Sequence, residues 1–392
     1  MRSHGRVSGV VLIGILAVLV GMLPGPAWSQ APTLKIGLQG VFSGELAAYG
    51  DRQKGGVLFA LSKAGEIKVG GQPVKIELVY ADDQGSGEKG PIAAQQLVDA
   101  RVNVVIGPGF SGPTASAMPI FRQAKIPAVS PFTSANNLAI IGGGWYFRVS
   151  QRNDCQGEVL AEIALGLGGK KVVIVDDNEA YGSDISKSVA KNLQAAGVQV
   201  VGQYHGALGM TDWSPIVQRI RQDSPEVVVY NGYHAEAGRL IQQARDRGVT
   251  AKFLGSDGIL DPGIFKVAPA EKLTDVSAIR TIPPAFVEGT ASSEYKRFQA
   301  EYPPFAKAQK LSITDADQYS AGAYDATNLL IDAVRRAQST DGQAMADALR
   351  STSYVGMTGP FQFEANGERK GCRISYFRLV GSEFKASAKP GQ

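Results

Sequence analysis

The sequence predicts an α/β protein built from largely parallel sheets in two similar blocks. Segments with strand alternation and segments with helical spacing follow one another almost throughout the chain. At 392 residues the chain is long for a single hydrophobic core, which favours two domains. The alternation starts near residue 33 and starts again near residue 152, so we expect blocks at 33–151 and 152–279.

The first block consists of strands and helices in turn. Val57, Leu58 and Leu61 recur at helical spacing within Tyr49–Leu61, whereas Val74–Tyr80 alternates as a strand. The other elements expected here are strands at 34–38, 103–106, 126–130 and 145–149, and helices near 92–98 and after residue 110.

The second block repeats this order, and a mostly helical segment follows it. Its strands are expected at 171–175, 198–201, 227–230 and 252–254, and its helices at 181–196, 215–221 and 235–247. Further helices are expected at 293–298, 318–336 and 343–349. The chain is expected to end in a pair of strands near 361–363 and 373–379.

A glycine-rich turn lies between the strand near 103–106 and the helix that follows it. That helix carries small hydroxyl residues in its first turn, and the next strand, within 126–136, ends in a second hydroxyl-rich turn. Ligands of open α/β sheets bind at the carboxyl ends of strands, and N–H groups at a helix start favour an anion such as a carboxylate. The two turns therefore predict a small-molecule site.

The overall composition is that of an ordinary globular protein, with 44% apolar and 19% charged residues. The 40 basic and 36 acidic residues give a net charge of +4. Without Arg2 and Arg6, which lie in a segment expected to be removed, the count is 38 against 36, or +2. This balance argues against nucleic acid or an anionic membrane surface as the main partner.

Residues 1–29 have the pattern of an export signal peptide. Arg2 and Arg6 precede the apolar run Val10–Leu23, and Ala27–Ser29 has the small-x-small pattern of a cleavage site. The alternative is an uncleaved membrane anchor, which the short run and the prolines after it disfavour. We therefore expect cleavage near Ser29 and an exported protein in the periplasm.

The two cysteines, Cys155 and Cys372, leave the redox chemistry open. A disulfide is allowed in an oxidising compartment, and two isolated buried thiols are equally allowed. We expect free thiols, since nothing in the sequence alone brings these two residues together.

Motifs for catalysis or for a cofactor are weak. Outside the signal segment the histidines are His205 and His234, and no metal-ligand spacing, dinucleotide fingerprint or phosphate-binding loop is present. Gly109–Pro113 resembles a nucleophile elbow, but that motif requires glycine where Pro113 stands. We expect no enzyme activity, no metal and no cofactor.

Paired acids follow two of the expected strands, at Asp82–Asp83 and Asp176–Asp177. They could act as a general acid and base. At strand ends such residues are more often helix caps and solvated turns, and we expect these roles.

The order of several short motifs along the chain is more specific than any one of them. They are Lys35–Leu38, Phe42–Gly44, Tyr49–Gly50, Tyr80–Asp83, Val105–Gly107, Ser130–Pro131, Phe147–Arg148, Asp154–Gly157, Tyr181–Gly182, Gly232–His234 and Gly255–Gly258. Together they resemble the leucine/isoleucine/valine-binding protein family, the periplasmic receptors of branched-chain amino acid ABC transporters. The resemblance covers essentially the whole chain after the signal segment.

This resemblance implies a type I periplasmic-binding-protein fold: two doubly wound parallel-sheet lobes joined by three hinge crossovers. The crossovers are expected near 150–153, 278–281 and 357–360. Lobe 1 would then comprise 33–151 plus 280–357, and lobe 2 would comprise 152–279 plus 358–392.

The resemblance also implies a set of ligand-binding residues at matching positions. Ser111 and Ser134, with N–H groups beside Thr133, would hold a ligand carboxylate, and Asp257 would face its ammonium group. Further contacts are expected from four tyrosines: Tyr181, Tyr233, Tyr49 and Tyr319. Each residue has a plainer interpretation when taken alone, because such tyrosines are often packed aromatics, Asp257 suits a turn and Ser111 suits a helix cap.

Two departures from the family pattern affect the expected ligand. The usual disulfide of the first lobe is absent, because Gly85 and Phe110 stand at the positions aligned with its cysteines. Phe110 and Phe132 place bulky rings beside the carboxylate turns. Rings that face inward would shrink or reshape an aliphatic pocket.

The leading hypothesis is an exported, monomeric receptor of an ABC importer. It would enclose a small amino acid, aliphatic or branched-chain, and dock on a membrane permease. An alternative is the same receptor class with an aromatic or other carboxylate or an amide as its ligand. Two further alternatives are a ligand-sensing regulatory domain and a secreted serine hydrolase that uses Ser111.

Overall fold

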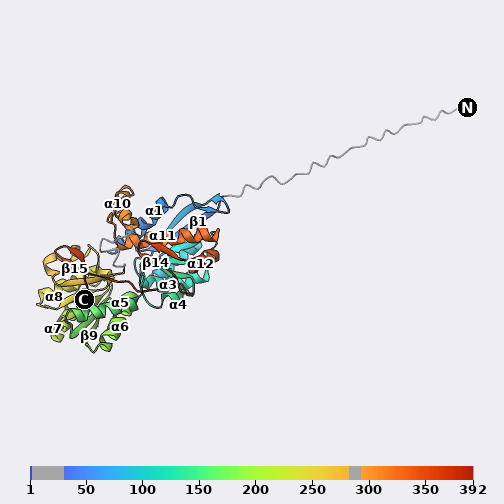
Figure 1. Cartoon of the computed structure of the whole chain (residues 1–392). Coiled ribbons are helices and arrows are strands. Elements are labelled where there is room, and N and C mark those ends of the chain that lie inside the picture. The colour runs from blue at the N-terminus through green and yellow to red at the C-terminus, as the bar shows by residue number, and fades with distance from the viewer. Residues whose placement is uncertain (2–30, 282–292, 392) are drawn as a thin grey trace. The chain divides into compact units, whose positions relative to one another are not determined.

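The computed structural model of the chain describes residues 1, 31–281 and 293–391 (Figure 1). From Pro32 onward the chain forms one compact unit. The expected signal peptide and its cleavage site near Ser29 lie outside the described residues.

The first half of the fold is built on a five-stranded parallel sheet. Its order is β4-β1-β5-β6-β7, so β1 lies between the next two strands of this sheet, β4 and β5. The strands are β1 (Thr33–Gly40), β4 (Lys75–Asp82), β5 (Val104–Ile106), β6 (Ala128–Ser130) and β7 (Tyr146–Arg148). This is a doubly wound order, and it places ligand sites at the carboxyl ends of the strands.

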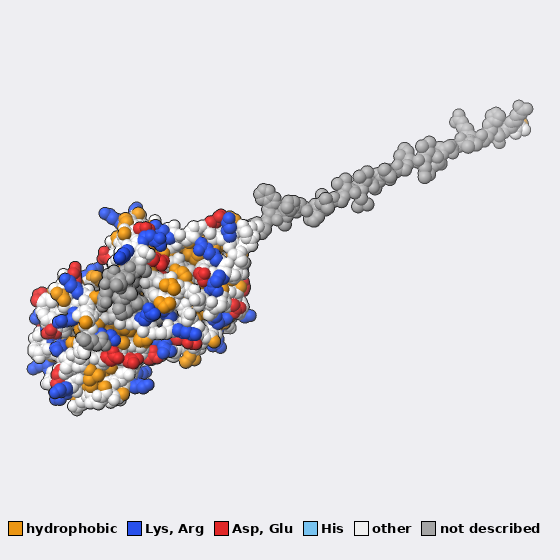
Figure 2. All heavy atoms as spheres, viewed as in Figure 1, with side chains coloured by type: hydrophobic (Ala, Val, Ile, Leu, Met, Phe, Trp, Pro, Cys, Tyr) orange, Lys and Arg blue, Asp and Glu red, His pale blue; other side chains and the backbone are white. Residues whose placement is uncertain are grey.

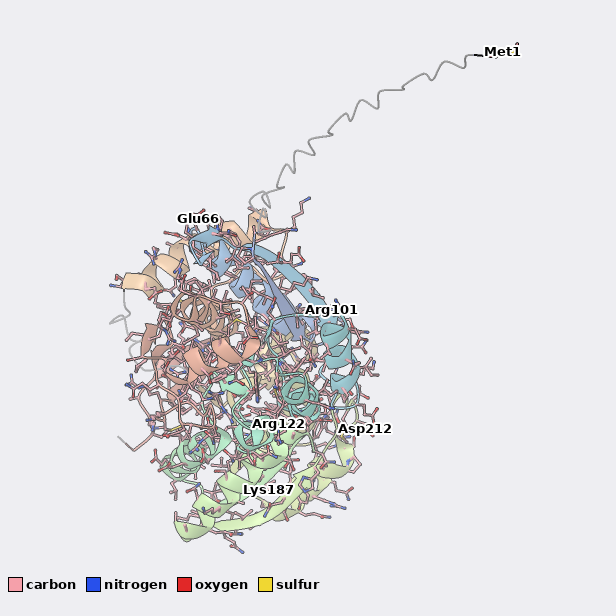
Figure 3. The ribbon with its side chains drawn as sticks, turned by 90° about the vertical axis from the view of Figure 1, so that its right-hand side faces the viewer. Met1, Glu66, Arg101, Arg122, Lys187 and Asp212 are labelled. Carbon is pink, nitrogen blue, oxygen red and sulfur yellow. A yellow bond between two sulfur atoms is a disulfide. The ribbon has the colours of Figure 1, made fainter. Side chains whose placement is uncertain are left out.

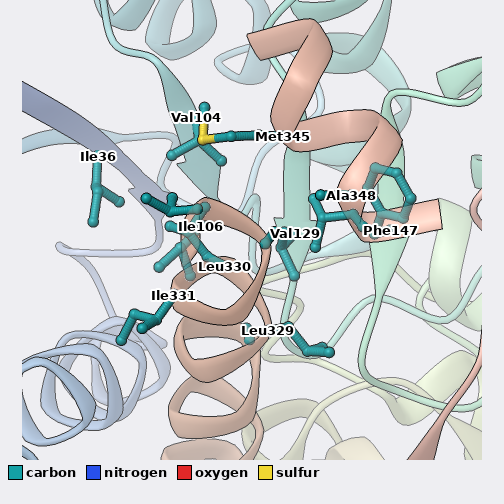
Figure 4. Close-up of a cluster of buried hydrophobic side chains, with 14 of the residues drawn as sticks. Ile36, Val104, Ile106, Val129, Phe147, Leu329, Leu330, Ile331, Met345 and Ala348 are labelled. Carbon is teal, nitrogen blue, oxygen red and sulfur yellow. The ribbon is translucent and has the colours of Figure 1, made fainter. Parts of the chain in front are cut away.

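Helices cover both faces of this sheet. One face packs against α1 (Ala47–Lys63), α11 (Gln318–Ala337) and α12 (Gly342–Arg350). Figure 4 shows Leu330 of α11 beside Ile106 of β5, and Met345 of α12 beside Val104. The other face packs against α2 (Gly90–Asp99), α3 (Ser111–Gln123) and α4 (Leu138–Gly142).

The second half repeats the arrangement around a seven-stranded sheet. Its order is β16-β15-β12-β11-β10-β8-β9, in which β8 to β12 are parallel and β15 and β16 are antiparallel additions. The strands are β8 (Lys171–Asp176), β9 (Gln199–His205), β10 (Val227–Asn231), β11 (Lys252–Gly255), β12 (Val276–Arg280), β15 (Ser375–Val380) and β16 (Glu383–Ser387).

Helices also cover both faces of the second sheet. One face carries α5 (Asn153–Gly166) and α6 (Ala180–Ala195), and the other carries α7 (Ser214–Asp223), α8 (His234–Asp246) and α9 (Ile264–Val267). The smaller elements are β2 (Lys68–Val69), β3 (Gln72–Pro73), β13 (Tyr354–Gly356), β14 (Gly359–Phe361), η1 (Asp257–Ile259) and η2 (Ala270–Lys272).

Late segments of the chain return to the first half. In Figure 1, α11 and α12 lie near β1. Helices α1 and α11 pack closely there: a Cβ built at Gly56 of α1 would lie 2.7 Å from the Cβ of Ala323 in α11. α10 (Ser293–Ala308) joins the same half, where Phe298 and Tyr302 pack on Phe59 of α1.

The C-terminal strand pairing differs from the sequence prediction. Residues near 361–363 do not pair with 373–379: β14 pairs with β13, and β15 pairs with β12 and β16. Phe361 and Phe363 instead pack into the core of the first half with Phe147. The prediction was wrong because apolar alternation identifies a strand but not its partner. Helix α5 and strand β12 were not predicted.

The expectation of free thiols is also wrong. Cys155, in the first turn of α5, and Cys372, just before β15, form a disulfide with a Cα–Cα distance of 5.7 Å. The two cysteines are 217 positions apart in the sequence. They become neighbours because the end of the chain returns to the second sheet beside the start of α5.

The paired acids at strand ends are turn residues, but most of them are not solvated. Asp83, Asp176 and Asp177 are buried, and Asp83 accepts hydrogen bonds from Gln39 Nε2 (3.2 Å) and from the N–H of Gly85 (2.9 Å). Burial raises the pKa of Asp83 to about 6. The side chains bond to N–H groups two residues on, as aspartates in turns do.

The surface carries charges of both signs. On the face seen in Figure 2, lysine and arginine side chains are interspersed with aspartate and glutamate. Glu66, Arg101, Arg122, Lys187 and Asp212, labelled in Figure 3, are all exposed. Within 31–281 and 293–391, no helix has the length and hydropathy needed to cross a membrane.

Helix α12 depends on a single side-chain cap, which gives a local stability prediction. The carboxylate of Asp341 accepts a hydrogen bond from the N–H of Ala344 at 3.1 Å. Replacing Asp341 with alanine is expected to lower the free energy of unfolding by about 1 kcal/mol, measured by urea denaturation. Asp341→Asn keeps an oxygen acceptor and is the control, so an equal loss in both variants would contradict the capping role.

Candidate functional site

A small cavity of about 20 Å³ lies between the carboxyl ends of strands from both sheets. This volume is far below the range for small-molecule pockets, about 300–1,000 Å³, so the side chains that line the cavity fill most of its space. It is lined by Tyr49, Gly109, Phe110, Ser111, Phe132, Thr133, Ser134, Tyr181, Tyr233, Asp257, Gly258 and Tyr319. The structure thus brings all ten residues named from the sequence to one cavity and adds Gly109 and Gly258.

The start of α3 forms one wall of the cavity. Phe110 is the extended N-cap residue, and Ser111 opens the helix with its hydroxyl directed at the neighbouring turn. Ser111 Oγ accepts hydrogen bonds from the N–H groups of Ser134 and Ala135, both at 3.3 Å. Two hydroxyl-rich turns therefore meet where the N–H groups of α3 begin, which is a favourable place for an anion.

Thr133 lines the cavity while its hydroxyl serves the turn. Its Oγ1 lies 2.5 Å from Ser130 Oγ and 2.6 Å from Tyr146 Oη, and all three residues are buried. Ser130 also donates to the carbonyl of Pro108 at 2.8 Å. This network fixes the turn, so the hydroxyl of Thr133 is engaged away from any ligand.

Aromatic rings from both halves close the cavity. Phe110 stacks on Tyr233 of the second half, with centroids 4.3 Å apart and planes at 8°. Tyr49 lies edge-on to Phe110 at 5.2 Å and to Tyr319 at 4.9 Å. Phe132 lies edge-on to Tyr319 at 5.3 Å. Both phenylalanines singled out from the sequence thus line the cavity and reduce its width.

The two positions aligned with the family's cysteines are neighbours. A Cβ built at Gly85 would lie 3.1 Å from the ring of Phe110. Gly85 has a φ of 73°, which glycine adopts without strain. The ring of Phe110 lies against this residue as well as against the cavity.

Asp257 is the acidic residue that the second half contributes to the lining of the cavity. It follows β11 at the start of η1, where its Oδ1 accepts a hydrogen bond from Tyr181 Oη at 2.6 Å and its Oδ2 accepts one from Thr281 Oγ1 at 3.3 Å. Burial raises its pKa to about 6, and bonds from Tyr181, Thr281 and Gln156 oppose that shift. A cation placed here would gain a buried counter-ion.

Two tyrosines of the first half reach the backbone of the second half beside Asp257. Tyr49 Oη donates to the carbonyl of Gly258 at 3.0 Å and lies 3.1 Å from His234 Nδ1. Tyr319 Oη donates to the carbonyl of Asp257 at 2.9 Å. Burial raises the pKa of both tyrosines well above the usual value, so both hydroxyls stay protonated as donors.

Sequence reasoning missed Thr281, Gln156 and Arg52 around this site. Thr281 follows β12, a strand that was not predicted, so nothing in the sequence indicated that Thr281 lies beside Asp257. Gln156 lies within the quoted motif Asp154–Gly157 but received no role. Arg52 lies three residues after Tyr49 on α1, a spacing that puts both on one helix face.

The polar groups of the site are engaged in hydrogen bonds within the protein. Ser111 Oγ accepts from main-chain N–H groups, and His234 lies against Tyr49. In the part of the chain that the structure describes, no group of three or more histidines, cysteines or acids could hold a metal ion. Donors on one wall and a carboxylate on the other suit a small ligand with charges at both ends.

A family model described as periplasmic binding protein matches residues 33–382. The chain belongs to the periplasmic binding protein family. The leucine-, isoleucine-, valine-, threonine- and alanine-binding protein of Pseudomonas aeruginosa is 27% identical over 87% of this chain and 88% of that protein.

Solved structures of periplasmic binding proteins share the fold. The branched-chain amino acid transporter substrate binding protein of Streptococcus pneumoniae, in complex with isoleucine, is 26% identical, with a TM-score of 0.78 over 91% of this chain and 99% of that chain. A Rhodopseudomonas palustris solute binding protein, in complex with benzoate, is 21% identical, with a TM-score of 0.78 over 90% and 95%. The predicted α/β class with two doubly wound parallel sheets is confirmed.

Proposed function

We propose that this chain is the exported receptor of an ABC importer and encloses a small aliphatic amino acid between two lobes. The observation that carries the proposal is the pairing of an anion site at Ser111 and Ser134 with Asp257 across one cavity. An amino acid zwitterion has the matching two charges. The names of the similar amino acid-binding proteins support the same ligand class.

We propose the lobe division implied by the family resemblance: 33–151 plus 280–357 for lobe 1, and 152–279 plus 358–392 for lobe 2. The two sheets and their helices support it, with one adjustment. Phe361 and Phe363 pack in the first half, and Phe363 forms a β-bridge with Arg369, which favours a third crossover between Arg369 and Ser375 rather than near 357–360. Ligand binding would favour the closed arrangement because only that form contacts the ligand from both sides.

Residues 1–29 would direct the protein to the periplasm, where the closed form would dock on a membrane permease as a monomer. An oxidising compartment suits the disulfide between Cys155 and Cys372.

A thermal-shift screen with isothermal titration calorimetry tests the ligand class. The expected result is stabilisation by L-leucine, L-valine or L-alanine, and native mass spectrometry should detect a co-purified amino acid. Stabilisation by benzoate or an amide, without any effect of amino acids, would overturn the amino acid proposal and favour the second candidate.

That second candidate is an aromatic or other carboxylate, or an amide, bound by the same receptor. It is favoured by the aromatic lining, because a planar ring could stack on Phe110 or Tyr233. A carboxylate without an amine would leave Asp257 without a cationic partner, so its binding would favour the protonated form of Asp257, which can donate a hydrogen bond.

Phe110 is expected to restrict the size of the ligand. Replacing Phe110 with alanine removes the ring that stacks on Tyr233, so the ratio of affinities for L-phenylalanine and L-valine should rise by about tenfold. Phe110→Tyr keeps the ring and is the matched control. An unchanged ratio in Phe110→Ala, measured by calorimetry, would show that the ring does not limit the pocket.

A further inference from the structure

A buried ion pair joins the two halves beside the candidate site. Arg52 lies on α1 of the first half, and its guanidinium Nη1 contacts Asp261 Oδ2 of the second half at 2.6 Å. The side chains are only 4% and 3% exposed. Two charges this far from water interact strongly, and removing Arg52 would leave the buried carboxylate of Asp261 without this cation.

Arg52 is held in the first half independently of Asp261. Its Nε pairs with Asp317, which caps α11 and starts the helix that carries Tyr319. The guanidinium also lies 5.7 Å from the ring centre of Tyr49 and 5.8 Å from that of Tyr319. Burial would lower the pKa of Arg52, but Asp317 and Asp261 raise it well above the usual value.

Asp261 belongs to the same loop as Asp257, whose carboxylate is proposed to contact the ligand. It lies four residues after Asp257, and its Oδ1 accepts a hydrogen bond from the N–H of Gly263 at 2.6 Å. The carbonyls of Asp257 and Gly258 in this loop accept from Tyr319 and Tyr49. The position of the loop relative to α1 is therefore fixed by Arg52 and by the two tyrosines together.

We propose that Arg52 is a positioning residue whose pair with Asp261 draws the Asp257 loop onto the first half and favours the closed form. The inference rests on the proposed closure of two lobes around a ligand. When the lobes separate, Asp261 regains water while Arg52 keeps Asp317, so the Arg52–Asp261 pair stabilises the closed form alone. The pair favours closure in the unliganded protein as well as in the liganded one.

Two isosteric variants of the full chain separate this role from simple packing. Asp261→Asn removes the charge that pairs with Arg52 from the second half, whereas Asp317→Asn removes the partner of Arg52 within the first half. Dissociation rates and Kd for L-leucine are measured by stopped-flow tyrosine fluorescence and calorimetry. The radius of gyration without ligand is measured by small-angle X-ray scattering, and melting temperatures report on folding.

Asp261→Asn is expected to raise the dissociation rate and the Kd by about 10- to 50-fold and to increase the radius of gyration of the unliganded protein. Asp317→Asn is expected to lower the melting temperature, while the Kd stays within about threefold and the scattering is unchanged. Wild-type dissociation and wild-type scattering for Asp261→Asn would overturn the positioning role.

Failure of the proposed ligand would give a different result. If the wild-type protein does not bind L-leucine, the ligand assignment fails and the scattering comparison alone decides the role of Arg52. A larger radius of gyration for Asp261→Asn than for wild type would then support it, and equal radii would refute it.

Discussion

Replacing Asp257 with asparagine is expected to weaken L-leucine binding at neutral pH by at least about 100-fold. The reason is that an ammonium group enclosed between the lobes would lose its buried counter-ion, while asparagine keeps the size of the side chain and an acceptor for Tyr181. Calorimetry of the purified variant measures the loss. Full-strength binding of L-leucine by Asp257→Asn would show that the zwitterion assignment is wrong.

The same carboxyl group predicts a pH dependence of affinity. Burial raises the pKa of Asp257 to about 6 in the unliganded protein, and an ammonium ligand needs the charged form. L-leucine affinity should therefore be constant above about pH 7 and fall at lower pH. Well below about pH 6 the loss of affinity should approach about tenfold for each pH unit. This dependence should be absent in Asp257→Asn.

The stability of the unliganded protein should respond to pH with the opposite sign. A carboxyl group whose pKa is raised by folding binds protons more tightly in the folded state than in the unfolded state. Asp257 therefore adds stability as the pH falls from about 6 toward its unfolded pKa of about 4. Asp83 and Asp325 also have pKa values raised to about 6, so affinity rather than stability isolates Asp257.

Asp177→Asn is the matched control for the charge. Asp177 is also a buried aspartate at a strand end of the second half, and burial raises its pKa well above the usual value. It does not line the cavity, so its variant should keep wild-type affinity and the wild-type pH profile. A similar loss in both variants would indicate a general electrostatic effect rather than a contact between Asp257 and the ligand.

Removing the disulfide is expected to lower the free energy of unfolding by roughly 2–5 kcal/mol. The bond closes a loop between positions 217 apart, so its loss frees a long segment in the unfolded chain. For a chain of this size the melting temperature of Cys155→Ser/Cys372→Ser should fall by roughly 3–7 °C. Differential scanning calorimetry measures the shift.

Reductant provides the control for this prediction. Treatment of the wild-type protein with a thiol reductant should lower its melting temperature to nearly that of the double serine variant, which should not respond. A double variant as stable as the oxidised wild type would contradict a stabilising role for the bond.

Local pattern was sufficient for most of the individual elements. The strand near 227–230 consists only of apolar residues with high strand propensity, and it forms an interior strand of the second sheet as β10. The expected helix at 318–336 appears as α11, with Asp317 as its cap. These predictions held because period and capping are properties of neighbouring residues.

Pairing over long distances was not predictable in the same way. β15 pairs with β12, and Cys155 pairs with Cys372, although nothing in the local sequence of either member identifies the other. The expected solvated turns were wrong for a related reason. Asp83 and Asp177 are polar and follow strands, and only the packing of other elements over them makes them buried.

Local patterns and the order of short motifs were enough to predict the α/β class, the two repeated blocks and ten of the twelve residues that line the cavity. The strand partners, the disulfide, the burial of Asp257 and the contact of Arg52 with Asp261 become apparent only in the folded chain. The physical reason is that periodicity and turn chemistry act within a few residues, whereas burial and ion pairing depend on which distant segments meet. Asp257 is a turn residue in the sequence, and the fold around it raises its pKa to about 6.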